Sequence, residues 1–285
     1  MLSEQDLPSG DRPIVVPFLK WAGGKRWLTN QFPEIFPQNF SRYVEPFLGG
    51  GAVYFHLQPE TAVLADANTQ LINTYQQIQE NWQAVWKALK RHQRKHTSEY
   101  YYIERNRQHR APHEAAAQFL YLNRTCWNGL YRVNLDGKFN VPIGTKDSVL
   151  MPTDNWRSVS NLLSRAMLTN SDFSSTIEGS CSGDFVFIDP PYVTRHNLNG
   201  FLKYNHKIFN WDDQIRLRDA VMAAARRGAK ILVTNADHES IRDLYANVGR
   251  HLSLSRQSVL AADSRNRGVT TELAIAVNYD PGIER

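Results

Sequence analysis

The stretch YVEPFLGGGAVYFHLQPETAVLAD, residues 43–66, decides the fold. A short apolar strand at Tyr43-Val44 runs into the glycines Gly49-Gly50-Gly51, and a helix is expected to follow them. A second apolar run, Thr61 to Leu64, then reaches Asp66. This order of strand, glycine-rich turn, helix, strand and acid opens a doubly wound, nucleotide-binding α/β sheet.

The glycine turn and Asp66 together favour nucleoside binding. Glycine lets the backbone approach a ligand closely, and an acid at the end of the next strand can accept ribose hydroxyls. A tight strand–helix turn with a capping aspartate would use the same residue types, so either feature alone is weak. No Walker lysine pattern accompanies the glycines, which disfavours a P-loop.

A second informative stretch is the buried apolar run Phe185 to Ile188, which ends in Asp189-Pro190-Pro191-Tyr192. An exocyclic amine of a nucleobase is a poor nucleophile, because its lone pair is delocalised into the ring. The Asp189 carboxylate and the Pro190 carbonyl can both accept its hydrogens, and Tyr192 can stack on the base. The prolines fix φ and end the strand, so the carbonyl can point outward. A simple strand-ending turn is the bland alternative.

The remaining chain continues the α/β alternation after an interruption. Helical spacing of apolar residues over 71–110 and an alanine-rich run over 114–122 predict an inserted, mostly helical domain. Asn210 is a candidate N-cap for a helix that ends before Gly228, with Asp213 three residues on. Further strands are expected over 166–168, 184–188, 230–234, 251–259 and 272–279, the last two as an antiparallel hairpin. We therefore predict a flexible tail (1–13), a catalytic domain (14–72 and 165–285) and an inserted domain (73–164).

Bulk properties narrow the class of protein. The 285 residues carry a net charge of +5, which favours a polyanionic partner. The two cysteines give neither a disulfide framework nor a zinc cluster, and the nine histidines show no metal-ligand spacing. No apolar run is long enough for a signal peptide or a bilayer span. We expect a cytoplasmic protein without metal, acting as a monomer.

The insert carries basic residues interleaved with aromatic ones. Lys87 to Lys95 is a basic helical run, which alone is most often a solvated face. Arg124 and Arg132 lie close to Trp127 in the segment that follows, and can contact phosphate or guanine. Asn123 and Asn128 could bond base edges, although Asn-Gly at 128–129 is also a turn signal.

Two shorter clusters have less decisive patterns. Trp21, Gly23, Gly24 and Lys25 expose backbone amides beside a cation, but a helix-entry loop would look the same. Asp172 in Ser171-Asp172-Phe173 could accept from an adenine amine or cap a helix, with equal weight.

Taken together, these segments resemble the Dam-type, class α DNA adenine N6-methyltransferases, especially the DpnM-like members. The resemblance runs from about Pro17 to Tyr279. Its motifs are FLKWAGGK (18–25), EPFLGGGAVYF (45–55), NRTCWNGLYRVN (123–134), KFNVPIG (138–144), SDF (171–173) and DPPY (189–192).

The resemblance implies a Rossmann-like methyltransferase sheet, S-adenosylmethionine as cofactor, and double-stranded DNA as partner, with an adenine flipped out of a GATC site. It places the catalytic tetrapeptide at Asp189, Pro190, Pro191 and Tyr192. It places the cofactor at Trp21, Lys25, Phe47, Gly49, Gly51, Asp66, Asp172, Phe173 and Asp189. It places DNA contacts at Lys20, Arg124, Trp127, Asn128, Leu130, Arg132, Asn134 and Pro142.

Within that DNA set, Lys20, Leu130, Arg132 and Pro142 match positions that read GATC in the family. Asn128 and Trp127 match the place where the vacancy of the flipped base is managed. The family often has phenylalanine or tyrosine where this chain has Trp127.

Three alternatives remain open on the sequence. A cytosine N4 methyltransferase could use the same amine acceptors. An RNA or protein amide methyltransferase is opposed by the basic insert, and a non-catalytic DNA-binding module by the intact acid, glycine and DPPY segments. Both a solitary methylase and the modification half of a restriction-modification system fit the residues.

Overall fold

The computed structural model of the protein describes residues 14–134, 137–195, 209–257 and 269–283. The chain forms two compact units. The first comprises Met1–Arg26, Gly49–Gln58 and Asn68–Leu168, and the second Trp27–Leu48, Pro59–Ala67 and Thr169–Arg285. This division differs from the predicted domain boundaries, because residues 14–26 and 49–58 group with the helical segment. The predicted tail, 1–13, lies outside the described residues.

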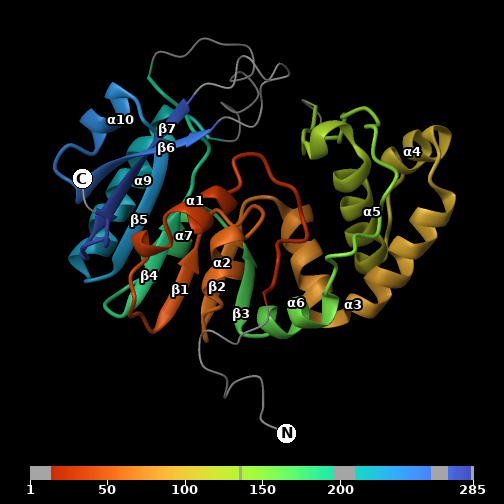
Figure 1. Ribbon diagram of the computed structural model, residues 1–285, viewed down its shortest axis with the longest axis horizontal. Helices are drawn as coiled ribbons and strands as arrows, with labels where there is room; N and C mark the ends of the chain where they lie inside the picture. The colour runs from red at the N-terminus through yellow and green to blue at the C-terminus, as the bar shows by residue number, and fades with distance from the viewer. Residues whose placement is uncertain (1–13, 135–136, 196–208, 258–268, 284–285) are drawn as a thin grey trace, which may run out of the picture. The chain divides into compact units, whose positions relative to one another are not determined.

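The described strands form one seven-stranded sheet in the order β3-β2-β1-β4-β5-β7-β6 (Figure 1). They are β1 (Arg42–Glu45), β2 (Ala62–Asp66), β3 (Ala166–Asn170), β4 (Asp184–Ile188), β5 (Lys230–Ala236), β6 (Arg250–Gln257) and β7 (Val269–Val277). β1 runs parallel to β2 and β4, β4 runs parallel to β5, and β7 runs antiparallel to β5 and β6. The predicted doubly wound sheet with a C-terminal antiparallel hairpin is confirmed.

The helices divide between the two units. In the first unit they are α2 (Ala52–Leu57), α3 (Thr69–Lys95), α4 (Ser98–Arg105), α5 (Pro112–Thr125), the 3-10 turn η2 (Trp127–Gly129) and α6 (Trp156–Leu163). In the second they are η1 (Pro33–Ile35), α7 (Phe173–Glu178), α9 (Trp211–Arg226) and α10 (Glu239–Leu244). α1 (Arg26–Gln31) begins at the last residue of a first-unit segment.

Local sequence signals set several of these ends. Asn210 and Asp213 form the predicted capping box of α9, each side chain accepting from the other residue's backbone amide. Asn68 caps α3 by accepting from the amide of Leu71. The left-handed Gly51 (φ 64°) starts α2, where the sequence predicts a helix.

In the core of the second unit, alternate side chains of β4 pack on the two opposite faces of the sheet. Val186 and Ile188 belong to a buried cluster with residues of α7, α9 and α10. Phe185 and Phe187 alternate with them and pack against Phe36, at ring-centroid distances of 6.4 Å. A strand buried on both faces reads as an unbroken apolar run, which is why the sequence predicts it so clearly.

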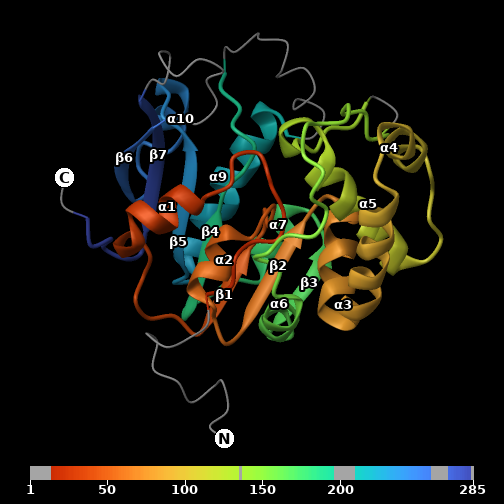
Figure 2. The same ribbon diagram turned by 45° about the vertical axis from the view of Figure 1, so that its right-hand side comes forward.

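In the first unit α3 and α5 lie side by side, as both ribbon views show (Figures 1 and 2). Near the end of α5, Arg124 makes a bidentate ion pair with Asp154, with both nitrogen–oxygen distances 2.7 Å. The guanidinium also donates to the carbonyls of Val149 and Phe18. Its side chain is 3% exposed, so Arg124 joins three segments of this unit from inside.

A second buried polar cluster of this unit surrounds His92. Its ring stacks on Tyr121 at 4.9 Å, and its Nδ1 is bonded to the Tyr100 hydroxyl. Burial lowers the pKa of His92 to about 4, more than the nearby Glu104 raises it. The imidazole is therefore neutral at physiological pH.

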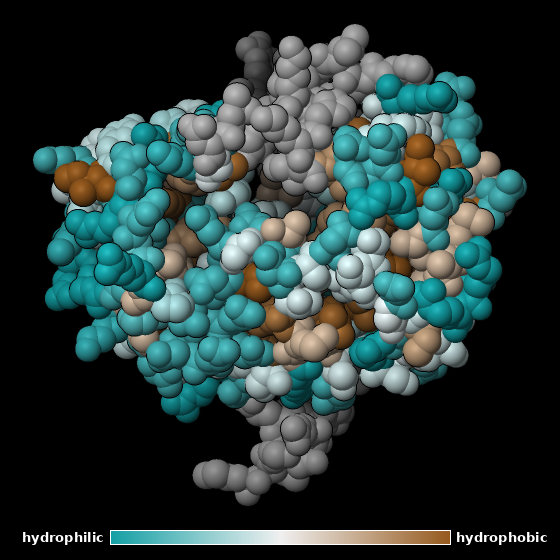
Figure 3. Space-filling model, turned by 180° about the vertical axis from the view of Figure 1, so that it is seen from behind, coloured by the Kyte–Doolittle hydropathy of each residue, from teal (hydrophilic) through white to brown (hydrophobic). Residues whose placement is uncertain are grey.

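The surface carries few exposed large apolar side chains among the described residues: Ile14, Trp86, Tyr102, Ile103, Trp127 and Met167. On the face drawn in Figure 3, hydrophobic residues appear as separate clusters within a mostly hydrophilic surface. None of the described helices has the length and apolarity that crossing a bilayer requires.

We expect Arg124→Ala to lower the free energy of unfolding by about 3–5 kcal/mol, because it leaves the Asp154 carboxylate buried without its cation. Arg132→Ala is the matched control, since Arg132 is exposed and bonds Asn140 at the surface. Its cost should stay within about 0.5 kcal/mol. Urea unfolding measures both, and equal costs would contradict a structural role for Arg124.

The neutral His92 makes stability depend on pH. Its folded pKa lies below the unfolded value, so the unfolded chain binds more protons between about pH 6.5 and 4. The stability that depends on a neutral His92 is therefore fully present above pH 6.5 and is lost as the pH falls to about 4. The loss amounts to about 3 kcal/mol. His92→Phe keeps a stacked ring but no titration, so urea unfolding should show a shallower slope; an unchanged slope would assign the effect elsewhere.

Candidate functional site

Three carboxyl groups lie at the same edge of the sheet in the second unit. β2, β1 and β4 are neighbours and parallel, so their carboxyl ends meet at one edge. Asp66 ends β2, Glu45 ends β1, and Asp189 follows β4. Open α/β sheets bind ligands outside this edge.

The electrostatics of this edge are unfavourable for a further negative charge. Glu45 is 2% exposed. Burial raises its pKa well above the usual range, and the charges of Asp189 and Asp66 raise it further, while the hydrogen bond from Tyr43 opposes them. Such a row of carboxyls suits a ligand that brings positive charge and hydroxyl donors.

Aromatic side chains extend this edge. Phe47, just beyond β1, stacks on Phe173 with ring centroids 5.3 Å apart. Phe173 opens α7 and is buried. Two of the predicted cofactor residues are thus in contact with each other.

Asp172 has the helix-capping role that the sequence left open. Its Oδ1 accepts from the Ser174 amide at 2.9 Å and from Arg216 at 2.8 Å. Burial opposes its ionisation, but the hydrogen bonds from Ser174 and Arg216 outweigh it and lower the pKa of Asp172. The carboxylate is therefore charged and held at the start of α7.

The tetrapeptide has partners that sequence reasoning missed. Thr234 of β5 donates to Asp189 Oδ1 at 2.8 Å, and the Tyr192 hydroxyl donates to Glu272 of β7 at 2.6 Å. Both partners are buried. The sequence signal that could have found them is a polar residue beside an apolar strand segment. Thr234 follows the apolar residues that begin at Ile231, and Glu272 precedes those that begin at Leu273.

The other predicted cofactor residues lie in the first unit. Gly49 has a positive φ of 48°, and a Cβ there would meet the Trp21 ring at 2.7 Å. Gly51 is also left-handed. Lys25 is 3% exposed, and its ammonium donates to the Gly23 carbonyl at 2.8 Å. Backbone conformation therefore favours glycine at both positions, and at Gly49 the packed indole also leaves no room for a side chain.

The predicted DNA-contacting residues all belong to the first unit. Asn123 is buried and holds the Lys20 backbone by two hydrogen bonds, at 3.0 and 2.8 Å. The side-chain amide of Asn123 therefore holds the Lys20 loop and is not directed at a base edge, as the sequence had suggested it could be. A Cβ on Gly129 would lie 2.6 Å from Lys20 Cδ, so the lysine stem packs directly on the turn.

The rest of this segment is tied together at the surface. The Trp127 amide donates to the Pro142 carbonyl, and Arg132 and Asn134 pair with Asn140 and Lys138. Trp127 is 52% exposed. Asn128 is exposed and left-handed, with φ 55°, and Leu130 is half-buried. Arg124 differs from the others, because its guanidinium is committed to Asp154 inside the unit.

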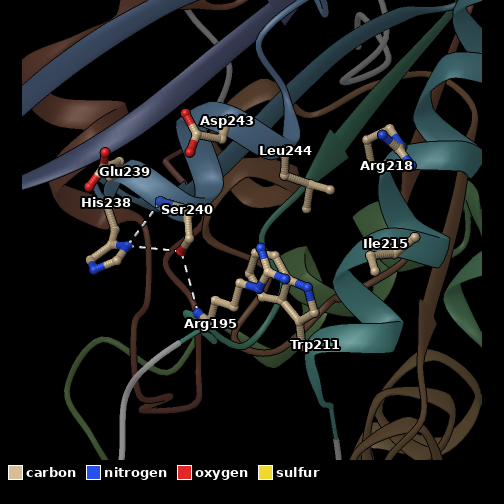
Figure 4. Close-up of a pocket in the computed structure, with 9 residues that line it drawn as sticks. All are labelled: Arg195, Trp211, Ile215, Arg218, His238, Glu239, Ser240, Asp243 and Leu244. Carbon is tan, nitrogen blue, oxygen red and sulfur yellow. Dashed lines mark hydrogen bonds between the residues drawn. The ribbon is translucent and has the colours of Figure 1, made fainter.

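The second unit also has a cavity of about 600 Å³ between α9 and α10 (Figure 4). It is lined by Arg195, Trp211, Ile215, Arg218, His238, Glu239, Ser240, Asp243 and Leu244. None of the predicted site residues lines it; Arg195, three residues beyond Tyr192, is the nearest in sequence to the tetrapeptide.

Comparisons with known proteins agree with this chemistry. The family model of D12 class N6 adenine-specific DNA methyltransferases matches residues 21–259. Among similar proteins, the Type II methyltransferase M1.LlaDCHI of Lactococcus lactis subsp. cremoris is 34% identical, over 92% of this chain and 95% of that protein. The DNA adenine methylase of Escherichia coli (strain K12) is 28% identical, over 93% and 96%.

A likeness to the solved structure of a putative RNA methyltransferase from Pyrococcus horikoshii is weak, with 10% identity and a TM-score of 0.35, over 96% of this chain and 92% of that one. The family assignment does not depend on it. The carboxyl row suits the ammonium, sulfonium and ribose groups of S-adenosylmethionine. The chain belongs to the D12 class N6 adenine-specific DNA methyltransferases, enzymes whose methyl donor is S-adenosylmethionine.

Proposed function

We propose that this enzyme methylates N6 of an adenine that is flipped out of duplex DNA, within GATC. The observation that carries the proposal is the position of Asp189. It follows β4, the strand between β1 and β5, and stands in a row of carboxyls at the ligand-binding edge. A base extruded from the helix can reach such an edge, whereas a stacked base cannot.

In the proposed mechanism Asp189 and the Pro190 carbonyl accept the hydrogens of the adenine amine. In this mechanism both acceptors are preorganised, and they stabilise the positive charge that develops on nitrogen until the surplus proton passes to Asp189 or to solvent. Tyr192 stacks on the base, a contact worth about 1–3 kcal/mol. S-Adenosylmethionine supplies the electrophilic methyl group when bound, held by Trp21, Lys25, Phe47, Gly49, Gly51, Asp66, Asp172, Phe173 and Asp189.

The proposed DNA surface consists of Lys20, Trp127, Asn128, Leu130, Arg132, Asn134 and Pro142. Hydrogen bonds tie this segment together, which supports a common recognition role. The neighbouring Lys146 and partial burial lower the pKa of Lys20, so an acceptor from DNA would relieve a crowded pair of cations. We leave Arg124 out, because its ion pair with Asp154 accounts for its charge.

We further propose that the enzyme acts on double-stranded DNA as a monomer in the cytoplasm. The net charge of +5 supports attraction to a polyanion without selecting a sequence.

The deciding experiment is transfer of a labelled methyl group to duplexes that contain GATC or its single-base variants, with the modified nucleoside identified. N6-methyladenine on GATC alone supports the whole proposal. If N6-methyladenine formed in another sequence, the proposed activity would stand and the proposed recognition sequence GATC would be wrong. Label on cytosine would overturn the proposed acceptor.

Asp189→Ala should lower kcat by about 100- to 1,000-fold, the scale of losing one preorganised group at a developing charge. Asp280→Ala is the control, because the Asp280 side chain is 83% exposed and pairs with Arg250 at the surface. Single-turnover kinetics measure both variants, with circular dichroism to confirm folding. Full activity of a folded Asp189→Ala protein would remove this carboxylate from the mechanism.

Arg132→Ala should relax discrimination at one base pair of the site by about 1–3 kcal/mol, if its guanidinium reads a guanine bidentately. Comparing kcat/KM on GATC and on single-base variants measures this. A uniform loss on all duplexes would assign Arg132 to phosphate contact instead.

A further inference from the structure

Buried polar side chains of β5 hold the carboxylate of the tetrapeptide. Ile188 of β4 is paired with Val233 of β5, so the next residue of each parallel strand, Asp189 and Thr234, lie side by side. The Thr234 hydroxyl donates to Asp189 Oδ1 at 2.8 Å. Thr234 has no exposed surface. A hydroxyl carries one hydrogen, and the Asp189 carboxylate is the nearer of its two acceptors, since the Ile188 carbonyl lies 3.4 Å away.

The Tyr192 side chain is held by its hydroxyl group, at the far end of the ring from the backbone. Its hydroxyl donates to Glu272 Oε2 at 2.6 Å, and Glu272 is 3% exposed. Arg256 of β6 places its Nε 2.9 Å from Glu272 Oε1, although that N–H is not aimed for a hydrogen bond, so the contact is an ion pair. Burial, with the charges of Asp189 and Glu272, raises the pKa of Tyr192, which keeps the hydroxyl a donor.

The backbone after the tetrapeptide has its own support. Gln214 of α9 donates to the Val193 carbonyl at 3.4 Å, and Asn235 of β5 donates to Gln214 Oε1 at 3.2 Å. Gln214 and Asn235 are both fully buried. Successive residues of β5, Thr234 and Asn235, thus fix both sides of the Asp-Pro-Pro-Tyr segment.

Two explanations of these contacts make different predictions. Buried polar groups need partners for stability alone, so the contacts could simply satisfy the interior. Methyl transfer, however, requires a carboxylate and a ring held in one orientation, and a displacement of about 1 Å can cost about 100-fold in rate. Only the second explanation predicts a loss in kcat that exceeds any loss in binding or stability.

We propose that Thr234 and Glu272 are positioning residues for the methyl transfer. Thr234 orients the Asp189 carboxylate toward the amine, and Glu272 sets the plane of the Tyr192 ring. The contacts Thr234–Asp189 and Tyr192–Glu272 carry this inference. It rests on the proposed function, in which Asp189 and Tyr192 receive the adenine.

Thr234→Val tests the first contact, because it keeps the shape of the side chain and removes the donor. We expect kcat to fall by about 10- to 100-fold, with KM for DNA and for S-adenosylmethionine changed by less than about threefold. Thr234→Ser restores the hydroxyl and should recover most of the rate. Unchanged kcat in Thr234→Val, or no recovery in Thr234→Ser, overturns the role of Thr234.

Thr74→Val is the matched control. Thr74 is also fully buried, but its hydroxyl bonds the Gln70 carbonyl within α3. It should keep the wild-type kcat, at whatever cost in melting temperature. If Thr74→Val and Thr234→Val lose rate equally, the effect is general destabilisation and the proposal fails.

Tyr192→Phe and Tyr245→Phe test the second contact. Each removes one hydroxyl from a tyrosine of the second unit, but the buried Tyr245 hydroxyl has no partner among the described residues. We expect about a tenfold loss of kcat from Tyr192→Phe and none from Tyr245→Phe. Glu272→Gln, which keeps an acceptor for the hydroxyl, should lose less than Tyr192→Phe. Equal rates of Tyr192→Phe and wild type overturn the role of Glu272.

A duplex with 2-aminopurine at the target adenine separates positioning from base capture, because its fluorescence rises when the base leaves the stack. Thr234→Val should give the wild-type rise on this duplex and slow transfer on the matching adenine duplex, because 2-aminopurine has no 6-amino group to methylate. A lost rise would make Thr234 a binding residue and overturn the proposal. A wild-type protein that methylates no adenine would instead refute the proposed function, before any variant is compared.

Discussion

The parallel pairing of β4 with β1 and β5 is the constraint on which the rest of the structure depends. Because all three strands run the same way, their carboxyl ends share one edge, and Glu45, Asp189 and Thr234 meet there without any loop to place them. The strands are buried on both faces, so their register is strongly specified. A shift of one residue would turn Asp189 away from Thr234 and break the apolar packing at the same time.

Burial and polarity work against each other at this edge. Glu45, Thr234 and Glu272 are nearly inaccessible to water, yet each has a protein partner. Groups held this way cannot reorganise cheaply, since moving one leaves another buried without a partner. The same rigidity that costs desolvation in folding therefore keeps the Asp189 carboxylate and the Tyr192 ring in one orientation.

Much of the fold could be predicted from local sequence. β4 was predicted at its observed bounds because an unbroken apolar run has few alternatives, and the capping box of α9 because both partners lie within four residues. Three short helices were not assigned bounds from the sequence. α6 was covered only by the mostly helical insert, and α1 and α7 were left as alternatives, α1 after a helix-entry loop and α7 with Asp172 as its N-cap. The serines and threonine of α7 favour turns as readily as helix.

The side-chain contacts at the site could not be predicted from the sequence. Tyr192 and Glu272 are 80 residues apart and Thr234 is 45 from Asp189, so their pairing depends on strand order rather than on spacing. Arg124 shows the opposite limit. A basic residue beside aromatic ones is typical of a DNA contact, and only the position of Asp154, 30 residues on, shows that its charge is used inside the protein.

The turn at Asn128-Gly129 links the main chain to a candidate recognition side chain. Both residues are left-handed, and the stem of Lys20 lies where any side chain at 129 would have to go. The direction of Lys20 is therefore set by a backbone more than 100 residues away in sequence. A side chain at position 129 would therefore displace the Lys20 stem, so the space open to that lysine is limited by a turn that only glycine leaves free.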